Sequence, residues 1–145
     1  MTTPGRMIGV KGAGMTTRRP ADARNLTGVW HGIYSYPNSN PPVSFVATLI
    51  ETATMLSGTT HEGEGRGTLF ATLAGHRHGS TVSFVKTYDG TNPDYRTVDY
   101  QGRLSGDATE IDGRWIIFGV WSGKFLMIRA RGVAETIVRQ ERVRA

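Results

Sequence analysis

The chain has 145 residues, of which 38% are hydrophobic and 20% are charged, and its formal net charge is +5. This length suits one domain with a buried core, and the composition differs from that of membrane-spanning and of disordered chains. Cysteine is absent, which excludes a disulfide scaffold, a thiol nucleophile and any cysteine-ligated metal site.

The positive charge lies near the two ends of the chain. Residues 1–25 contain five basic residues and one acidic residue, and residues 129–145 contain five arginines and two glutamates. The stretch between them contains seven basic and nine acidic residues. Domains that recognise nucleic acid gather positive charge on a folded surface beside stacking aromatics. We therefore expect no specific nucleic-acid partner, and no apolar run has the length of a membrane helix.

Residues 1–24 show neither a helical nor a strand period and are rich in Gly, Thr, Pro and Arg. We expect a flexible basic arm, and a segment that folds over the mouth of a pocket is the alternative. The arm lacks the apolar stretch of a secretion signal. Together with the absence of cysteine, this predicts a cytoplasmic location.

Residues 25–131 have the composition of an all-β domain. Thr, Val and Ile together far outnumber Leu, which favours strands because branched side chains pack well on a pleated surface. Turn residues separate eight strand-like segments, at residues 27–36, 43–52, 56–62, 68–76, 81–88, 96–104, 110–118 and 121–130. Residues 132–145 are expected to form a short helix or a charged tail.

The links between these segments are short and contain no long helical insert, which predicts an antiparallel meander. Such a sheet has two unpaired edges unless it closes on itself. We therefore expect a single eight-stranded antiparallel up-and-down β-barrel, whose interior holds side chains or one small ligand. An open sandwich is the alternative.

Several short motifs resemble those of avidins. The Thr-Gly-Val-Trp segment at residues 27–30 is similar to the opening avidin strand and, more loosely, to the Gly-x-Trp start of lipocalins. Residues 56–59, 100–103 and 111–117 resemble three later avidin strands, and Trp121 followed by Phe125 resembles the last one. The resemblance implies an avidin-like, calycin-like barrel with a pocket.

The same resemblance argues against biotin as the ligand. Avidins hold the biotin ureido group through polar residues of the first, third and last strands. The matching positions here are Gly32, Tyr36, Thr60, Glu62 and Arg129, and none keeps the family's contact. Only the aromatic framework of Trp30, Tyr100 and Trp115 is similar.

Strand alternation decides which side chains point inward, and we assign the faces that hold most aromatics to the interior. The residues expected to bind a ligand there are Trp30, Tyr34, Tyr36, Glu62, Phe84, Lys86, Tyr88, Tyr100, Trp115, Trp121 and Arg129, with Arg96 as a further cation. An aromatic wall with a few convergent polar groups is typical of small-molecule sites.

This pattern predicts a small-molecule-binding barrel with an aromatic, partly cationic interior that suits an anionic ligand. The alternative is structural: Lys86 and Arg129 lie at a rim, or pair with Glu62 as an ion pair, because buried ions are costly without a partner.

Two other functions stay open. One is an enzyme, such as a cyclase or isomerase, that uses the barrel cavity with Glu62, Lys86 and Tyr88 as candidate catalytic residues. The other is an oligomeric interaction module, a dimer or tetramer. It would associate through outward apolar residues at Val46, Ile50, Phe70, Ile116, Phe118, Leu126 and Ile128.

The i, i+2 spacing of His76 and His78 could place both rings on one strand face as metal ligands. Gly75 and Gly79 flank the pair and favour a solvated turn instead. We therefore expect no metal ion, and no motif predicts a cofactor.

Overall fold

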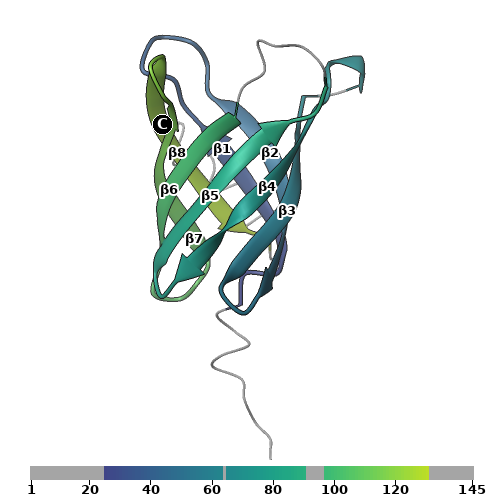
Figure 1. The fold of residues 1–145 in the computed structure, drawn as a ribbon. Coiled ribbons are helices and arrows are strands. Elements are labelled where there is room, and N and C mark those ends of the chain that lie inside the picture. The colour runs from purple at the N-terminus through teal and green to yellow at the C-terminus, as the bar shows by residue number, and fades with distance from the viewer. Residues whose placement is uncertain (1–24, 64, 91–96, 131–145) are drawn as a thin grey trace, which may run out of the picture.

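The predicted strands are all present in the structure, a computed structural model that describes residues 25–63, 65–90 and 97–130. They are β1 (Gly28–Tyr34), β2 (Val43–Thr52), β3 (Met55–Glu62), β4 (Leu69–His78), β5 (Thr81–Tyr88), β6 (Thr97–Leu104), β7 (Glu110–Ile117) and β8 (Trp121–Arg129). Each strand pairs antiparallel with the next, and β1 also pairs with β8, which closes the sheet into a barrel (Figure 1). The predicted all-β, eight-stranded up-and-down barrel is confirmed.

Some of the expectations fall on parts of the chain that the structure does not describe. These parts include the arm over residues 1–24, the tail over residues 132–145, and Arg96. Within the described ranges, helical structure is limited to a 3-10 turn, Gly65–Gly67, and no helix there is long and apolar enough to cross a bilayer.

Alternation places one face of each strand in the barrel interior. In β2, Phe45, Ala47 and Leu49 are buried, whereas Ser44, Thr48 and Ile50, which alternate with them, are exposed. This period of two arises because successive side chains of a strand point to opposite faces of the sheet. The buried inward side chains of the strands join into one hydrophobic core. Among the described residues, the apolar side chains of the predicted inward faces belong to this core or pack against it.

A glycine in β1 allows the middle of the barrel to be filled. Gly32 pairs with Phe45 of β2, and the Phe45 ring occupies the space that a Cβ at Gly32 would need. The Phe45 ring centroid lies 6.0 Å from that of Tyr34 at the end of β1. The middle of the barrel, next to the end of β1, is therefore filled by side chains.

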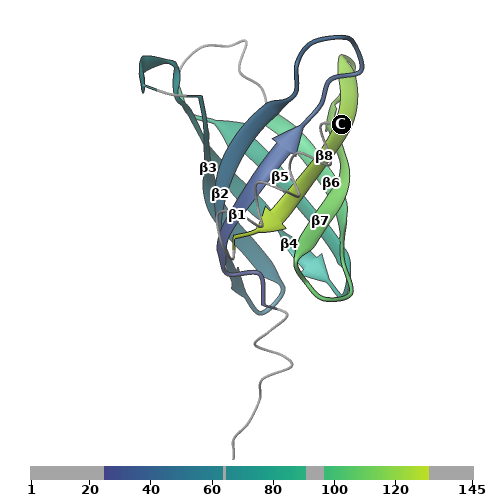
Figure 2. The ribbon, with the colours of Figure 1, turned by 180° about the vertical axis from the view of Figure 1, so that it is seen from behind.

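The residues just before β1 close one end of the barrel. Leu26 is fully buried, its N–H donates to the Glu51 carboxylate (2.9 Å), and its carbonyl accepts from the Trp30 indole N–H (2.9 Å). Arg77 of β4 pairs with the same Glu51 carboxylate at 2.9 Å. Figure 2 shows β1 and β8 side by side, with the start of β1 and the end of β8 at this closed end.

Arg129, at the end of β8, secures the closed end. Its guanidinium lies over the Trp30 ring, 4.6 Å from a ring centroid, and donates to the backbone oxygens of Ala108 (3.1 Å) and Asn25 (2.8 Å). A planar guanidinium suits this combination of ring stacking and several directed hydrogen bonds. The side chain therefore ties β8 to the residues that precede β1.

The predicted turn at His76 and His78 is wrong, because β4 continues to His78. Gly75 does not end the strand: a Cβ there would overlap the backbone of β5, so this glycine permits close strand packing. The turn follows at Gly79, which has a φ of 61°. The two imidazole rings lie 5.0 Å apart on the exposed face. The described residues contain no group of three His, Cys, Asp or Glu that could hold a metal ion.

The outward apolar positions differ in exposure. Ile50 (52%), Phe70 (56%) and Phe118 (74%) are exposed, and Val46, Ile116 and Leu126 are partly buried. Ile128 is only 1% exposed, so its expected place on an exposed barrel wall is wrong. Strand alternation predicts which face a side chain is on, but not whether that face is covered. An oligomer formed through the remaining positions stays a prediction.

Candidate functional site

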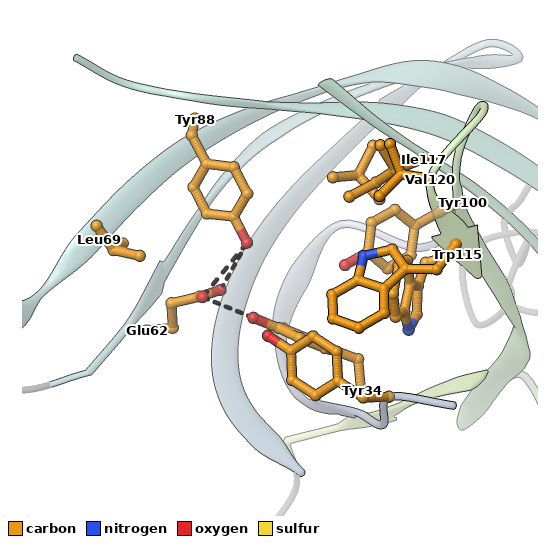
Figure 3. Close-up of a pocket in the computed structure, with 11 residues that line it drawn as sticks. Tyr34, Glu62, Leu69, Tyr88, Tyr100, Trp115, Ile117 and Val120 are labelled. Atoms are coloured by element: carbon orange, nitrogen blue, oxygen red, sulfur yellow. Dashed lines mark hydrogen bonds between the residues drawn. The ribbon is translucent and has the colours of Figure 1, made fainter. Parts of the chain in front are cut away.

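A pocket of about 320 Å³ opens at the end of the barrel opposite to Trp30 and Leu26 (Figure 3). At this end of the barrel the odd-numbered strands end and the even-numbered strands begin. Seven of the eight strands, or the turns next to them, contribute residues to the pocket. The lining residues are Tyr34, Tyr36, Glu62, Leu69, Tyr88, Val98, Tyr100, Trp115, Ile117, Val120 and Trp121. Among the described residues, the lining is thus mainly aromatic and aliphatic, and Glu62 is its one carboxylate.

The Glu62 carboxylate is the centre of a hydrogen-bond network on one side of the pocket. The Tyr34 hydroxyl donates to Oε1 at 2.8 Å, and the Tyr88 hydroxyl lies 3.3 and 3.2 Å from the two carboxylate oxygens. Lys86 Nζ donates to Oε2 at 3.2 Å. Because β3 and β5 flank β4 in the sheet, the Lys86–Glu62 ion pair spans the inner face of β4.

The Lys86 ammonium is paired with Glu62 inside the barrel and does not line the pocket. Its side chain is 1% exposed, and Nζ lies 4.8–5.5 Å from the ring centroids of Tyr34, Phe45, Tyr88 and Tyr100. Burial lowers the pKa of Lys86, whereas the charge and hydrogen bond of Glu62 oppose that shift. The interior therefore contains the predicted cation, but it is paired with Glu62 and does not line the pocket.

Three tyrosines of the pocket keep their protons over the physiological range. Burial, and to a smaller extent neighbouring charges that include Glu62, raise the pKa of Tyr34, Tyr88 and Tyr100 above the ordinary value. Their rings stay neutral and their hydroxyls keep a proton to donate. Lys86 Nζ also approaches the Tyr100 hydroxyl at 3.4 Å.

Tyr36, Trp115 and Trp121 form an aromatic wall of the pocket, which continues to Tyr34 because the Tyr34 and Tyr36 ring centroids are 5.7 Å apart. The ring centroids of Tyr36 and Trp121 are 5.1 Å apart, and those of Trp115 and Trp121 are 6.1 Å apart and edge-to-face. The Trp115 indole N–H donates to the Ser35 carbonyl at 2.9 Å. A Cβ at Gly123 would lie 2.6 Å from that indole nitrogen, so the glycine makes room for the ring. Figure 3 shows Trp115 facing Glu62 and Tyr88 across the pocket.

Most of the residues predicted to bind a ligand meet in this pocket. Those that line it are Tyr34, Tyr36, Glu62, Tyr88, Tyr100, Trp115 and Trp121. Phe84 stacks on Tyr100 at 4.9 Å, and neither Phe84 nor Lys86 lines the pocket. Trp30 and Arg129 contact each other at the closed end.

Four lining residues were not among the predicted ones: Leu69, Val98, Ile117 and Val120. Val98 and Ile117 share inward faces with Tyr100 and Trp115, so strand alternation could have identified them. Val120 lies between β7 and β8, where the period of two does not apply. Aliphatic side chains of this kind give no sequence signal that separates a pocket from a core.

The sequence matches no protein-family model and no curated protein. The closed eight-stranded antiparallel barrel is the architecture that the resemblance to avidins implied, and membership of that family stays a prediction.

Proposed function

We propose that the barrel binds a small molecule with a flat ring in the pocket at its open end. The observation that carries this proposal is the aromatic wall of Tyr36, Trp115 and Trp121, which lines the same open cavity as the Glu62 network. Aromatic rings attract one another in offset or edge-to-face arrangements. Such a wall favours a flat, ring-containing ligand.

The size and depth of the pocket narrow the ligand further. About 320 Å³ is at the small end of the range for small-molecule sites. Beneath the pocket, Phe45, Phe84 and Phe125 are all at least 96% buried and fill the barrel. The ligand would therefore occupy the mouth of the barrel, with its ring against the aromatic wall and a polar group toward Glu62 and the tyrosine hydroxyls.

Catalysis on the same barrel is the second candidate function, because Glu62 and Tyr88 both line the pocket. Three donors already approach the Glu62 oxygens. The carboxylate would have to give up a hydrogen bond before it could take a proton from a substrate. This feature favours binding over general-base catalysis.

A thermal-shift screen with ring-containing metabolites tests the binding function. A ligand at 100 times its Kd adds about 2.7 kcal/mol to the free energy of unfolding, which raises Tm by several degrees. Because an aromatic contact contributes about 0.5–1.5 kcal/mol, Trp121→Ala is expected to weaken binding about threefold to tenfold.

The matched control is Phe70→Ala, which removes an exposed aromatic ring from the outer face of β4. Its ligand-induced shift should equal that of the wild-type chain. Equal weakening in both variants, or no shift with any ring compound, would contradict the proposed function.

A further inference from the structure

We propose that the ligand of this pocket carries a methylated organic ammonium group, and that the pocket discriminates against anions. This inference rests on the proposed binding function and names the class of its ligand.

The charges of the pocket argue for a cation. Glu62 is the one formally charged side chain among the described residues that line it. Lys86 is 1% exposed, is paired with that carboxylate and does not line the pocket, and Arg129 stacks on Trp30 at the closed end. An anion that enters the pocket would meet the Glu62 carboxylate before any described cation.

The rings of the pocket argue in the same direction. Six of its lining side chains are aromatic: Tyr34, Tyr36, Tyr88, Tyr100, Trp115 and Trp121. The face of a neutral aromatic ring attracts a cation that lies within about 6 Å of its centroid. Aromatic enclosures of this kind are a known means of recognising quaternary and methylated ammonium groups in proteins.

The barrel already stabilises one ammonium group by this chemistry. Lys86 Nζ lies within 5.5 Å of four ring centroids and 3.2 Å from Glu62 Oε2. Three of those rings, together with Glu62, also line the pocket. The groups that surround the internal ammonium are thus in place to contact a second cation from the solvent side.

The occupied hydrogen bonds of Glu62 indicate which ammonium fits best. Tyr34, Tyr88 and Lys86 already donate to its two oxygens, so little acceptor capacity is left for an unsubstituted ammonium with three N–H donors. A methylated nitrogen needs no hydrogen bond, and its charge can still be stabilised by the ring faces and by the nearby carboxylate.

Three probes of nearly equal shape test this inference on the full chain. Phenyltrimethylammonium, tert-butylbenzene and benzenesulfonate share a phenyl ring and differ in the charge of a tetrahedral head group. Binding is measured by tryptophan fluorescence and by the shift in Tm. We expect phenyltrimethylammonium to bind at least tenfold more tightly than tert-butylbenzene, and benzenesulfonate to bind most weakly.

The double variant Glu62→Gln/Lys86→Met removes the carboxylate without leaving a buried charge unpaired. It should reduce the preference for the cation over the neutral probe at least threefold. The control Asp99→Asn removes a carboxylate from the outer face of β6 and should keep the full preference.

Each failure has a distinct meaning. Equal or tighter binding of tert-butylbenzene or benzenesulfonate would overturn the preference for a cation and would support the proposed binding function. An undiminished preference in the double variant would also overturn the inference, because Glu62 would then not select the charge. No response to any of the three probes would overturn it together with the binding of ring compounds.

Discussion

Glu62→Gln is expected to lower the free energy of unfolding by about 3–5 kcal/mol, the usual loss when one partner of a buried ion pair is removed. Lys86 is 1% exposed, and Glu62 is the anion that neutralises it at 3.2 Å. The amide of glutamine can accept a hydrogen bond but carries no charge. The measurement is urea unfolding near neutral pH, followed by tryptophan fluorescence.

The loss in Glu62→Gln should shrink as pH rises. Burial already lowers the pKa of Lys86, and the variant loses the Glu62 charge and hydrogen bond that oppose that shift. The folded variant then binds fewer protons than the unfolded chain, so its stability increases with pH below the ordinary lysine pKa. Once Lys86 is neutral it no longer needs a counter-ion.

The double variant Glu62→Gln/Lys86→Met is expected to recover most of the lost stability, because uncharged side chains of similar volume can replace a buried ion pair. Asp99→Asn, on the outer face, should unfold at nearly the wild-type urea concentration. If Glu62→Gln also unfolds at nearly the wild-type urea concentration, Glu62 does not stabilise a buried charge on Lys86.

Trp30→Ala is expected to cost about 3–5 kcal/mol of stability, as is typical when a large buried aromatic side chain is truncated. Trp30 has no exposed surface, donates to the Leu26 carbonyl and lies under the Arg129 guanidinium. Its removal would open a cavity at the closed end and leave these partners without their contact. Urea unfolding of the purified variant measures the loss.

Trp121→Ala is the matched comparison, because Trp121 is only partly buried at the mouth. It should unfold much closer to the wild-type chain while losing affinity for ring compounds. Trp30→Phe, a milder change, should retain the fold and full ligand affinity. Equal destabilisation by Trp30→Ala and Trp121→Ala would contradict the conclusion that the closed end of the barrel stabilises the fold whereas the open end binds the ligand.

The strands and their inward faces could be predicted from the sequence because each signal is local. Turn residues mark the ends of strands, and the period of two assigns each side chain to a face. Gly75 shows where such signals fail. In the sequence it reads as a turn residue, but in the structure it lies within β4 against the backbone of β5.

The prediction of the site from the sequence did not include the end of the barrel at which each inward residue lies. Arg129 and Trp30 point inward as predicted, but they pair at the closed end rather than at the pocket. In an up-and-down barrel, the start of the first strand and the end of the eighth lie at the same end. Strand order would therefore have separated these two residues from Glu62 and Tyr88, which lie at the ends of β3 and β5.

The pairing of Lys86 with Glu62 depends on long-range geometry. Alternation predicts that both side chains are in the interior, and an ion pair between them was one of the alternatives. The two strands are not neighbours in the sheet, so the contact depends on the diameter of the closed barrel and on the small inward residues around it. These quantities follow from the complete three-dimensional structure.

The most direct test of a ligand-binding mouth is the NMR spectrum of the three tryptophan indole N–H groups during a titration with phenyltrimethylammonium. Trp115 and Trp121 line the pocket, whereas Trp30 lies at the closed end. Single Trp→Phe variants assign the three signals. Saturable shifts of the Trp115 and Trp121 signals, with the Trp30 signal unchanged, are the expected result. Three signals that stay in place with this probe and with tert-butylbenzene and benzenesulfonate, or a Trp30 signal that moves as far as the other two, would contradict ligand binding at the open end.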